Sequence, residues 1–255
     1  MSHRVCAVIP AAGRGTRLGH GVPKIMIEIA DGVTVWHLLH RRLRPWAEHV
    51  HVVLSPDGEP LFRELAELAE LAELDSAAVS VSVQPQPTGM GDAIFGAAGH
   101  WAAYDTILVV WGDQANLSSA TVRDVMAAHP GKGLTVPLVA MPQPYVEYEL
   151  SGRELVRVRQ SREGEECRTG GLSDVGVFCL ATDGLREAWE RYAARPLGRG
   201  AATGEVNFLP FLPYLSQAEG WPVTVVPVSD PAEARGVNTA DDLEFARQAY
   251  LRCPD

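Results

Sequence analysis

Residues Pro10 to Lys24 read Pro-Ala-Ala-Gly-Arg-Gly-Thr-Arg-Leu-Gly-His-Gly-Val-Pro-Lys, directly after an apolar run, Val5 to Ile9, that we predict to be a buried strand. Small residues let backbone N–H groups approach an anion, and arginine and lysine add fixed positive charge. The pattern predicts a phosphate-binding loop at the carboxyl end of the first strand, where open α/β sheets bind ligands. Its candidate residues are Ala11, Ala12, Gly13, Arg14, Gly15, Thr16, Arg17 and Lys24.

Two other glycine-rich loops are excluded. A Walker A loop requires Gly-Lys-Ser or Gly-Lys-Thr, and neither occurs in the chain. The dinucleotide fingerprint G-x-G-x-x-G requires a glycine where this chain has Leu18, and Pro23 stands where the second turn of its helix would run. An ordinary strand-to-helix turn with surface arginines is the remaining alternative, and the tight order of strand, loop, arginine, proline and lysine argues against it.

Composition limits the classes of protein that need to be considered. The 255 residues are 46% hydrophobic and 21% charged, which fits one large or two small globular domains. The net charge of −10 argues against a nucleic-acid surface. We expect no membrane association, because no apolar run approaches the roughly 20 residues of a membrane span. The four cysteines lack C-x-x-C spacing and no signal peptide is recognisable, so we expect reduced thiols in a cytoplasmic protein.

Predicted strands and helices alternate as far as about residue 133 and then give way mainly to strands. This order predicts an α/β fold, Rossmann-like and doubly wound, with a mostly parallel mixed sheet and a small β-rich substrate lobe. We expect a single domain over 1–255, with a phosphate-binding part at about 1–133 plus 236–255 and a substrate-binding lobe at about 134–235. The predicted strands are 5–9, 49–54, 77–84, 106–111, 134–141, 155–160, 175–180 and 223–228, and the predicted helices include 34–44, 66–74, 92–104, 118–129, 207–219 and 239–251.

Two further segments carry candidate ligand-binding residues. Asp113 follows the apolar strand predicted at 106–111, so its carboxylate should be exposed at the ligand-binding edge of the sheet. Gln84 and Gly89 lie in a proline-rich loop, where the amide of a glutamine can pair with a base edge and a glycine lets the backbone approach a ring. Taken alone, each segment has a simpler interpretation. Asp113 can be a residue that caps a helix, and the segment of Gln84 and Gly89 can be an ordinary proline-rich turn.

The loop from Pro10 to Lys24 resembles the signature loop of the sugar-phosphate nucleotidyltransferases, most closely that of the uridylyltransferase domain of bacterial N-acetylglucosamine-1-phosphate uridylyltransferase. The segment 84–93 resembles the family's base-recognition segment Gln-x-x-x-x-Gly-Thr-Gly-His-Ala, with Met90 and Asp92 as departures. Gly236-Val-Asn238 resembles the segment before the family's last helix. The resemblance implies a fold of the nucleotide-diphospho-sugar transferase type.

The resemblance also implies a reaction, in which a nucleoside triphosphate and a sugar-1-phosphate, or a cyclitol phosphate, give a nucleotide sugar and pyrophosphate. Arg17 and Lys24 would be catalytic, and Asp113 and Asn238 would hold Mg²⁺. Nucleotide and sugar contacts would come from the loop residues 11–16 and from Gln84, Gly89, Gln160, Asp174 and Glu205. Only the resemblance favours UTP, and the oligomeric state stays open.

The resemblance weakens between residues 140 and 200, where relatives recognise the sugar. Asp174 stands where relatives carry Asn, Gln160 replaces a carboxylate, and Val146 replaces the Tyr of a Tyr-Gly pair. We therefore expect N-acetylglucosamine-1-phosphate to be a poor substrate. Two other functions remain open, a catalytically silent sugar-nucleotide-binding module and a nicotinamide-dependent oxidoreductase, and Leu18 and Pro23 argue against the second.

Overall fold

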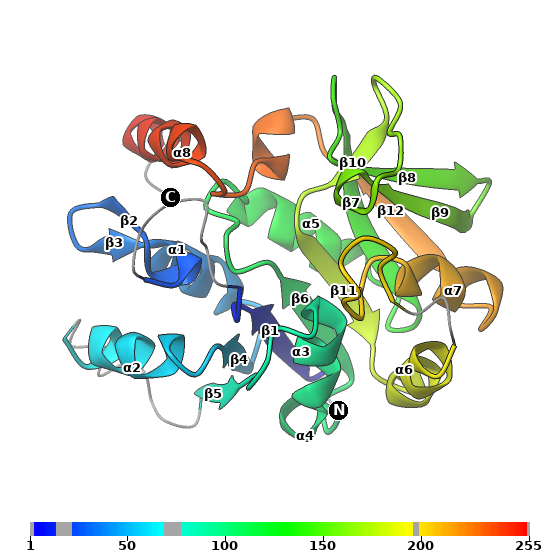
Figure 1. Ribbon diagram of the computed structural model, residues 1–255, viewed down its shortest axis with the longest axis horizontal. Helices are drawn as coiled ribbons and strands as arrows, with labels where there is room; N and C mark the ends of the chain where they lie inside the picture. Colours follow the sequence, from blue (N-terminus) through cyan, green and yellow to red (C-terminus); the bar gives the residue numbers. More distant parts are fainter. Residues whose placement is uncertain (1–2, 14–21, 69–77, 196–198, 254–255) are drawn as a thin grey trace.

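The fold is built on one large mixed sheet with helices on both faces (Figure 1). The computed structural model describes residues 3–13, 22–68, 78–195 and 199–253. Strands of the sheet follow the order β5-β4-β1-β6-β11-β7-β10-β8-β9, and β12 pairs with β7. The Rossmann-like, doubly wound α/β fold predicted from the sequence is confirmed.

The first half of the sheet is parallel. Its strands are β1 (Val5–Pro10), β4 (His49–Leu54), β5 (Val79–Val83) and β6 (Thr106–Val110). β1 lies between β4 and β6, and all three pairings in this half are parallel. Since β1 and β6 are buried along their whole length, apolar residues occupy both faces of each strand.

Alternate residues of each strand enter two separate cores. Val5, Ala7 and Ile9 of β1 pack with α1 (Val35–Leu43), α2 (Gly58–Leu68), α5 (Ser119–Ala128) and α8 (Ala240–Arg252). Cys6 and Val8 face the opposite core, which contains α3 (Met90–Gly96), α4 (Ala98–Trp101), α6 (Leu185–Ala193) and α7 (Phe211–Gln217). Because successive side chains of a strand point to opposite faces of the sheet, β1 contributes to both cores, as a doubly wound fold requires.

The second half of the sheet is mainly antiparallel. Its strands are β7 (Leu134–Ala140), β8 (Val146–Ser151), β9 (Glu154–Gln160), β10 (Leu172–Asp174), β11 (Val177–Ala181) and β12 (Val223–Pro227). β11 runs antiparallel to β6, so the direction of the strands reverses at this point in the sheet. β8 and β10 were not predicted. β8 alternates apolar and polar residues, which is a strand signal that could have located it, and β10 has only three residues.

Several helix boundaries differ from the prediction. The helix expected over 92–104 is two helices, α3 and α4, which meet at Ala97. The helix expected over 207–219 is limited to α7 at Phe211–Gln217, after a turn that contains Pro210. Of the helix expected over 66–74, residues 66–68 form the end of α2, and residues 69–74 lie outside the described residues. The remaining short elements are η2 (Lys24–Met26), β2 (Glu28–Ala30), β3 (Val33–Thr34), η3 (Ser161–Glu163) and η5 (Pro231–Ala234).

Two expectations concern the whole chain, that it does not associate with membranes and that it divides into a nucleotide-binding part and a sugar-binding lobe. Among the described residues, none of the helices combines the length and the apolarity that a membrane crossing requires. The division into a nucleotide-binding part and a sugar-binding lobe stays a prediction.

His51 is a polar residue in the core of the parallel half. Its side chain is fully buried, with Nδ1 2.7 Å from the Ser80 hydroxyl and Nε2 2.8 Å from the Ser82 hydroxyl. Its ring stacks on His100 at 4.0 Å between centroids. Burial, together with the neighbouring His100 and His49, lowers the pKa of His51 from 6.5 to about 3. The native protein therefore keeps this ring neutral.

We predict that His51 makes the protein sensitive to acid. Between about pH 6.5 and pH 3 the unfolded chain binds a proton at His51 and the native state does not, so stability falls as the pH falls through this window. The loss approaches about 1.4 kcal/mol per pH unit for one proton. His51→Leu should give a smaller slope of unfolding free energy against pH, measured by urea denaturation between pH 7 and pH 4.5. Equal slopes in the two proteins would contradict the assignment.

Candidate functional site

Two adjoining pockets open beyond the carboxyl ends of β1 and β6. The first, here called pocket A, has a volume of about 300 Å³, and the second, pocket B, about 600 Å³. Both are lined by Met90, Trp111, Asp113, Arg162 and Asn238, so the pockets meet along these residues. The location agrees with the general rule for open α/β sheets.

The first part of the predicted phosphate loop forms one wall of pocket A. Ala11, Ala12 and Gly13 line the pocket, and the Ala11 amide donates to the Val53 carbonyl at 2.8 Å. A Cβ atom on Gly112 would lie 2.9 Å from the Ala11 Cβ, so glycine at this position allows the ends of β1 and β6 to approach closely. Arg14, Gly15, Thr16 and Arg17 lie outside the described residues, and their predicted roles stay predictions.

Lys24 connects the two predicted metal ligands. Its Nζ donates to Asp113 Oδ2 at 2.8 Å and to Asn238 Oδ1 at 2.6 Å. The Lys24 and Asp113 side chains are about one-fifth exposed, so this ion pair is only partly solvated. Three segments that are far apart in the sequence therefore meet at one ammonium group. The roles predicted for these residues stay predictions.

The backbone around Asn238 explains how it reaches Asp113. The Val237 amide donates to the Asp113 carbonyl at 2.9 Å, and the Asn238 Nδ2 donates to the Gly236 carbonyl at 3.2 Å. This second bond turns Oδ1 toward Lys24. A capping box between Thr239 and Asp242 then begins α8, which also fixes the Asn238 backbone.

The Asp113 and Asn238 oxygens are of the type that a hard divalent cation accepts, and the Lys24 ammonium lies between them. Both lie within hydrogen-bonding distance of one nitrogen, so they converge on a single point. Among the residues that the structure describes, no group of three or more His, Cys, Asp or Glu could hold a metal. One carboxylate and one amide oxygen match Mg²⁺, which usually retains waters and takes its other ligands from phosphates.

The segment 84–89 contributes Gln84, Pro87 and Gly89 to the lining of pocket A. Gln84 Nε2 donates to the Gly89 carbonyl at 3.0 Å and to Thr88 Oγ1 at 3.1 Å. Gly89 has φ +124°, and a Cβ atom there would lie 2.6 Å from the Val206 carbonyl oxygen. Gly89 also precedes the first turn of α3, which contains Asp92. Gln84 and Gly89 are therefore brought together at pocket A.

Pocket B contains the predicted residues Gln160 and Asp174 together with Val146. Gln160 and Asp174 are buried, and Asp174 Oδ1 accepts from the Gly176 amide at 2.8 Å. Burial raises the pKa of Asp174 from 3.8 to about 6, although hydrogen bonds from Gly176 and the neighbouring Tyr148 oppose the shift. This carboxylate therefore titrates close to neutral pH.

Arg162 is a site residue that the sequence analysis did not select. It lies in η3 directly after β9, lines both pockets, and forms an ion pair with Glu205, a predicted site residue in pocket A. The neighbouring Glu163 accepts from the Thr203 hydroxyl at 2.7 Å and from Asn207 Nδ2 at 3.1 Å. Burial would raise the pKa of Glu163, but these bonds and the Ala202 amide outweigh it and lower the pKa. The sequence signal for Arg162 is a basic residue shortly after the strand predicted at 155–160.

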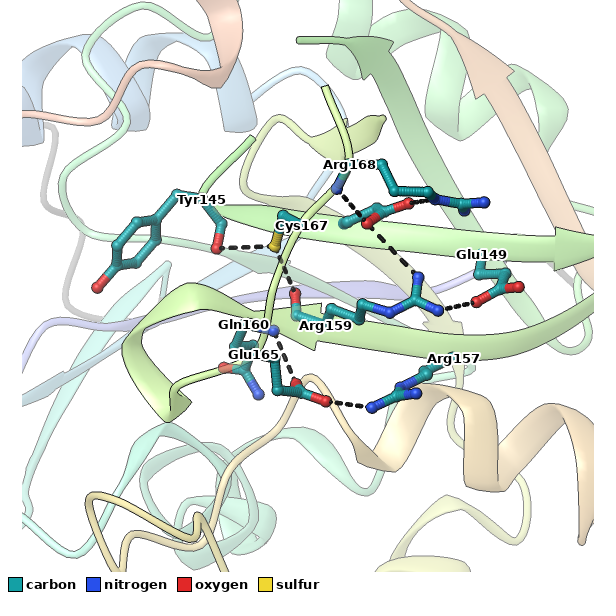
Figure 2. Close-up of polar contacts among 9 residues, drawn as sticks. Tyr145, Glu149, Arg157, Arg159, Gln160, Glu165, Cys167 and Arg168 are labelled. Carbon is teal, nitrogen blue, oxygen red and sulfur yellow. Dashed lines mark hydrogen bonds and ion pairs between the residues drawn. The ribbon is translucent and has the colours of Figure 1, made fainter. Parts of the chain in front are cut away.

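A network of ion pairs supports the wall of pocket B that contains Gln160 and Tyr145 (Figure 2). Glu165 Oε2 accepts from the Gln160 amide at 2.9 Å, and its Oε1 pairs with Arg157 at 2.7 Å. The buried Glu147 carboxylate accepts from the Arg168 amide at 2.8 Å. The loop after β9 is thereby held at both ends. Arg159, paired with Glu149 at 2.6 Å, continues the network along the hairpin.

Comparison with known protein families identifies the chain. Residues 7–193, more than half of its length, match the model of the MobA-like NTP transferase domain. The chain belongs to this family. Its members transfer nucleotides, so a transferase activity agrees with a pocket at the carboxyl ends of the strands that brings Lys24, Asp113 and Asn238 together.

One solved structure similar to this NTP transferase is that of a protein from Bacillus anthracis proposed to be a glucose-1-phosphate thymidylyltransferase, crystallised in complex with sucrose. The TM-score is 0.72, the sequences are 13% identical, and the match covers 96% of this chain and 94% of that chain. At this identity the likeness concerns the fold, and it confirms the nucleotide-diphospho-sugar transferase type. It does not single out the uridylyltransferase that the loop resembles.

We predict that Gly89→Ala destabilises this NTP transferase by about 1–3 kcal/mol, because an L-residue at φ +124° is strained and its Cβ would collide with the Val206 backbone. Urea denaturation measures the loss. Gly99→Ala is the matched control, since a Cβ at that helical position meets nothing within 4 Å. The control should be neutral or slightly stabilising. A Gly89→Ala protein as stable as the control would show that the segment adapts freely.

Proposed function

We propose that the protein joins a nucleoside triphosphate to a sugar-1-phosphate, or to a sugar-like cyclitol phosphate, with release of pyrophosphate. The observation that supports this most is the junction of the two pockets at Asp113 and Asn238, beside the Lys24 ammonium. Two substrates bound in adjoining pockets would have their phosphates side by side at that junction.

In the proposed reaction, an oxygen of the acceptor phosphate attacks the α-phosphorus of the triphosphate in line. The new oxygen–phosphorus bond forms as the bond to the β-phosphate oxygen breaks, and pyrophosphate carries away the electron pair. Such transfers depend on positioning and on stabilisation of charge. A protein nucleophile is therefore not required.

The described residues divide between the two substrates. In pocket A, Gln84 and Gly89 would contact the base, and Ala11 to Gly13 would approach the phosphates through their backbone. In pocket B, Gln160 and Asp174 would contact the acceptor. Arg162 lines both pockets and would neutralise phosphate charge on either side of the bond that forms.

Asp113 and Asn238 would hold Mg²⁺, whose charge would neutralise the phosphates and the leaving pyrophosphate. In the structure Lys24 donates to both of these oxygens. Its ammonium group would therefore also be close to the phosphates that Mg²⁺ would contact. We propose that Lys24 contacts the α-phosphate and the acceptor phosphate, and that Arg17 contacts the leaving phosphates.

The acceptor is expected to be a sugar or cyclitol phosphate other than N-acetylglucosamine-1-phosphate. An ionised Asp174 accepts hydrogen bonds and cannot donate one to an amide carbonyl. Val146 adds a branched side chain to pocket B. UTP is the nucleotide that the loop resemblance favours. The second candidate function is a silent sugar-nucleotide-binding module, which the changed character of residues 146 and 160 motivates.

A screen for pyrophosphate release tests the proposal. UTP, CTP, GTP and dTTP are each combined with Mg²⁺ and with glucose-1-phosphate, mannose-1-phosphate, N-acetylglucosamine-1-phosphate or myo-inositol-1-phosphate. We predict turnover for at least one pair, and a loss of about 100-fold or more in Asp113→Ala with the fold retained. Binding without turnover would favour the silent module. An Asp113→Ala enzyme with full activity would contradict the site.

We predict that Asp174 gives acceptor binding a pH dependence. Its pKa of about 6 means that the carboxylate form, which accepts hydrogen bonds from acceptor hydroxyls, becomes dominant as the pH rises through 6. KM for the acceptor should therefore fall between pH 5 and pH 7, whereas KM for the nucleotide should not share this step. Initial-rate kinetics across this range provide the measurement.

Asp174→Asn is the control, because the second ionisation of a phosphate also has a pKa near 6. The part of the pH dependence that comes from the acceptor phosphate persists in this variant, and the part that comes from the carboxylate disappears. Identical pH profiles for the two enzymes would show that Asp174 does not titrate in contact with the acceptor.

A further inference from the structure

The Glu163 carboxylate binds several groups of the segment 199–207, which lies far from it in the sequence. Its Oε2 accepts from the Ala202 amide at 2.9 Å, and its Oε1 accepts from the Thr203 hydroxyl at 2.7 Å and from Asn207 Nδ2 at 3.1 Å. The Glu163 side chain is only 7% exposed. Burial would raise its pKa, but these bonds outweigh burial and lower the pKa. An ionised carboxylate therefore ties η3 to the segment 199–207.

The segment 199–207 is paired in turn with the wall of pocket A that contains Gly89. The Val206 amide donates to the Thr88 carbonyl at 2.8 Å, and the Gly91 amide donates to the Val206 carbonyl at 3.1 Å. The same Val206 carbonyl oxygen is the atom that a Cβ atom on Gly89 would approach to 2.6 Å. Movement of the segment 199–207 would therefore displace the backbone on both sides of Gly89.

Turns make up most of the segment 199–207, so its own backbone bonds do little to hold it. The Gly200 amide donates to the Glu205 carbonyl at 2.8 Å, and the Gly204 amide donates to the Gly200 carbonyl at 2.9 Å. A Cβ atom on Gly200 would lie 2.6 Å from Glu163 Oε1, so glycine at this position lets the chain close around the carboxylate. Ordering a loop costs conformational entropy, and the bonds to Glu163 offset that cost.

A second link between η3 and the segment 199–207 is the ion pair of Arg162 with Glu205. Both of these residues line pocket A, where the phosphates of the nucleotide are proposed to bind. A bound phosphate would compete with Glu205 for the Arg162 guanidinium. The bonds of the buried Glu163 carboxylate are not exposed to this competition. Glu163 is therefore the link that persists when the pocket is occupied.

We propose that Glu163 is a positioning residue for nucleobase selection, an inference that rests on the proposed function. In the described part of the chain, Glu163 is not among the residues that line pocket A. It acts through the segment 199–207, which fixes the backbone beside Gly89. Hydrogen bonds to a base edge discriminate between bases only where the protein groups are held to within about 0.5 Å. Selection of the base then depends on a carboxylate that does not contact the nucleotide.

The test measures the dissociation constants of UTP, CTP, GTP and dTTP, each with Mg²⁺, by isothermal titration calorimetry. Glu163→Met keeps the approximate size of the side chain and leaves the donors of the segment 199–207 without their acceptor. The ratio of the weakest to the tightest dissociation constant should fall by about tenfold in this variant. Glu163→Gln should keep part of the selectivity, because its amide oxygen can still accept from the Ala202 amide.

Two further variants separate this role from a general loss of stability. Thr203→Val removes one bond to Glu163 at an exposed position, so it should fold and should lower the selectivity in the same direction. Glu190→Met is the matched control, because Glu190 pairs with Arg186 on the surface of α6. The control should keep the selectivity of the wild type. Thermal unfolding of each variant shows whether it is folded.

A purely structural role would lower the unfolding temperature and weaken the binding of all four nucleotides by the same factor. An unchanged ratio in Thr203→Val and in folded Glu163→Met would overturn the inference, as would a wild type that does not discriminate between the bases. A wild type that discriminates between them but releases no pyrophosphate with any acceptor would instead refute the proposed function. A wild type that binds none of the four nucleotides would overturn both.

Discussion

The contact of Lys24 with Asp113 and Asn238 is the interaction on which the arrangement of the site depends. It joins the end of the phosphate loop, the end of β6 and the start of α8 through one ammonium group. Lys24 lies in η2, and Asp113 follows β6, which pairs with β1. The Val237 amide ties the segment of Asn238 to the Asp113 carbonyl. The contact is therefore a consequence of the fold, and it sets where the two pockets meet.

The net charge of −10 makes this local arrangement of cations important. An acidic protein that binds polyphosphate must concentrate positive potential at the site. In the described residues Lys24 and Arg162 provide it, and each is held by a carboxylate, Asp113 or Glu205. These pairs keep the cations in place before a phosphate arrives. An anionic ligand then competes with a carboxylate for each cation, and Mg²⁺ at Asp113 would leave Lys24 available to the phosphates.

The sequence predicted the parallel half of the sheet and its ligand-binding edge well, because buried parallel strands read as apolar runs and their carboxyl ends are followed by Ala11 or Asp113. The family resemblance placed Lys24, Asp113 and Asn238 among the candidate site residues, and the structure brings their side chains into contact. The sequence did not predict β8 or the role of Arg162. β8 alternates polar and apolar residues, and its glutamates pair with arginines from β9 and from the loop that follows. Such pairings depend on strand register, which no local pattern in the sequence reveals.

The two pockets differ in how their polar groups are satisfied, and this difference bears on specificity. In pocket A the charged groups already have partners, so a nucleotide would exchange one set of charged contacts for another. In pocket B burial raises the pKa of the Asp174 carboxyl group. A buried carboxyl group of this kind gains most from a neutral donor such as a hydroxyl, since a hydroxyl satisfies it without bringing further charge into a buried region. Selection of the acceptor is thus expected to depend on the hydroxyls of its ring, and anchoring on its phosphate.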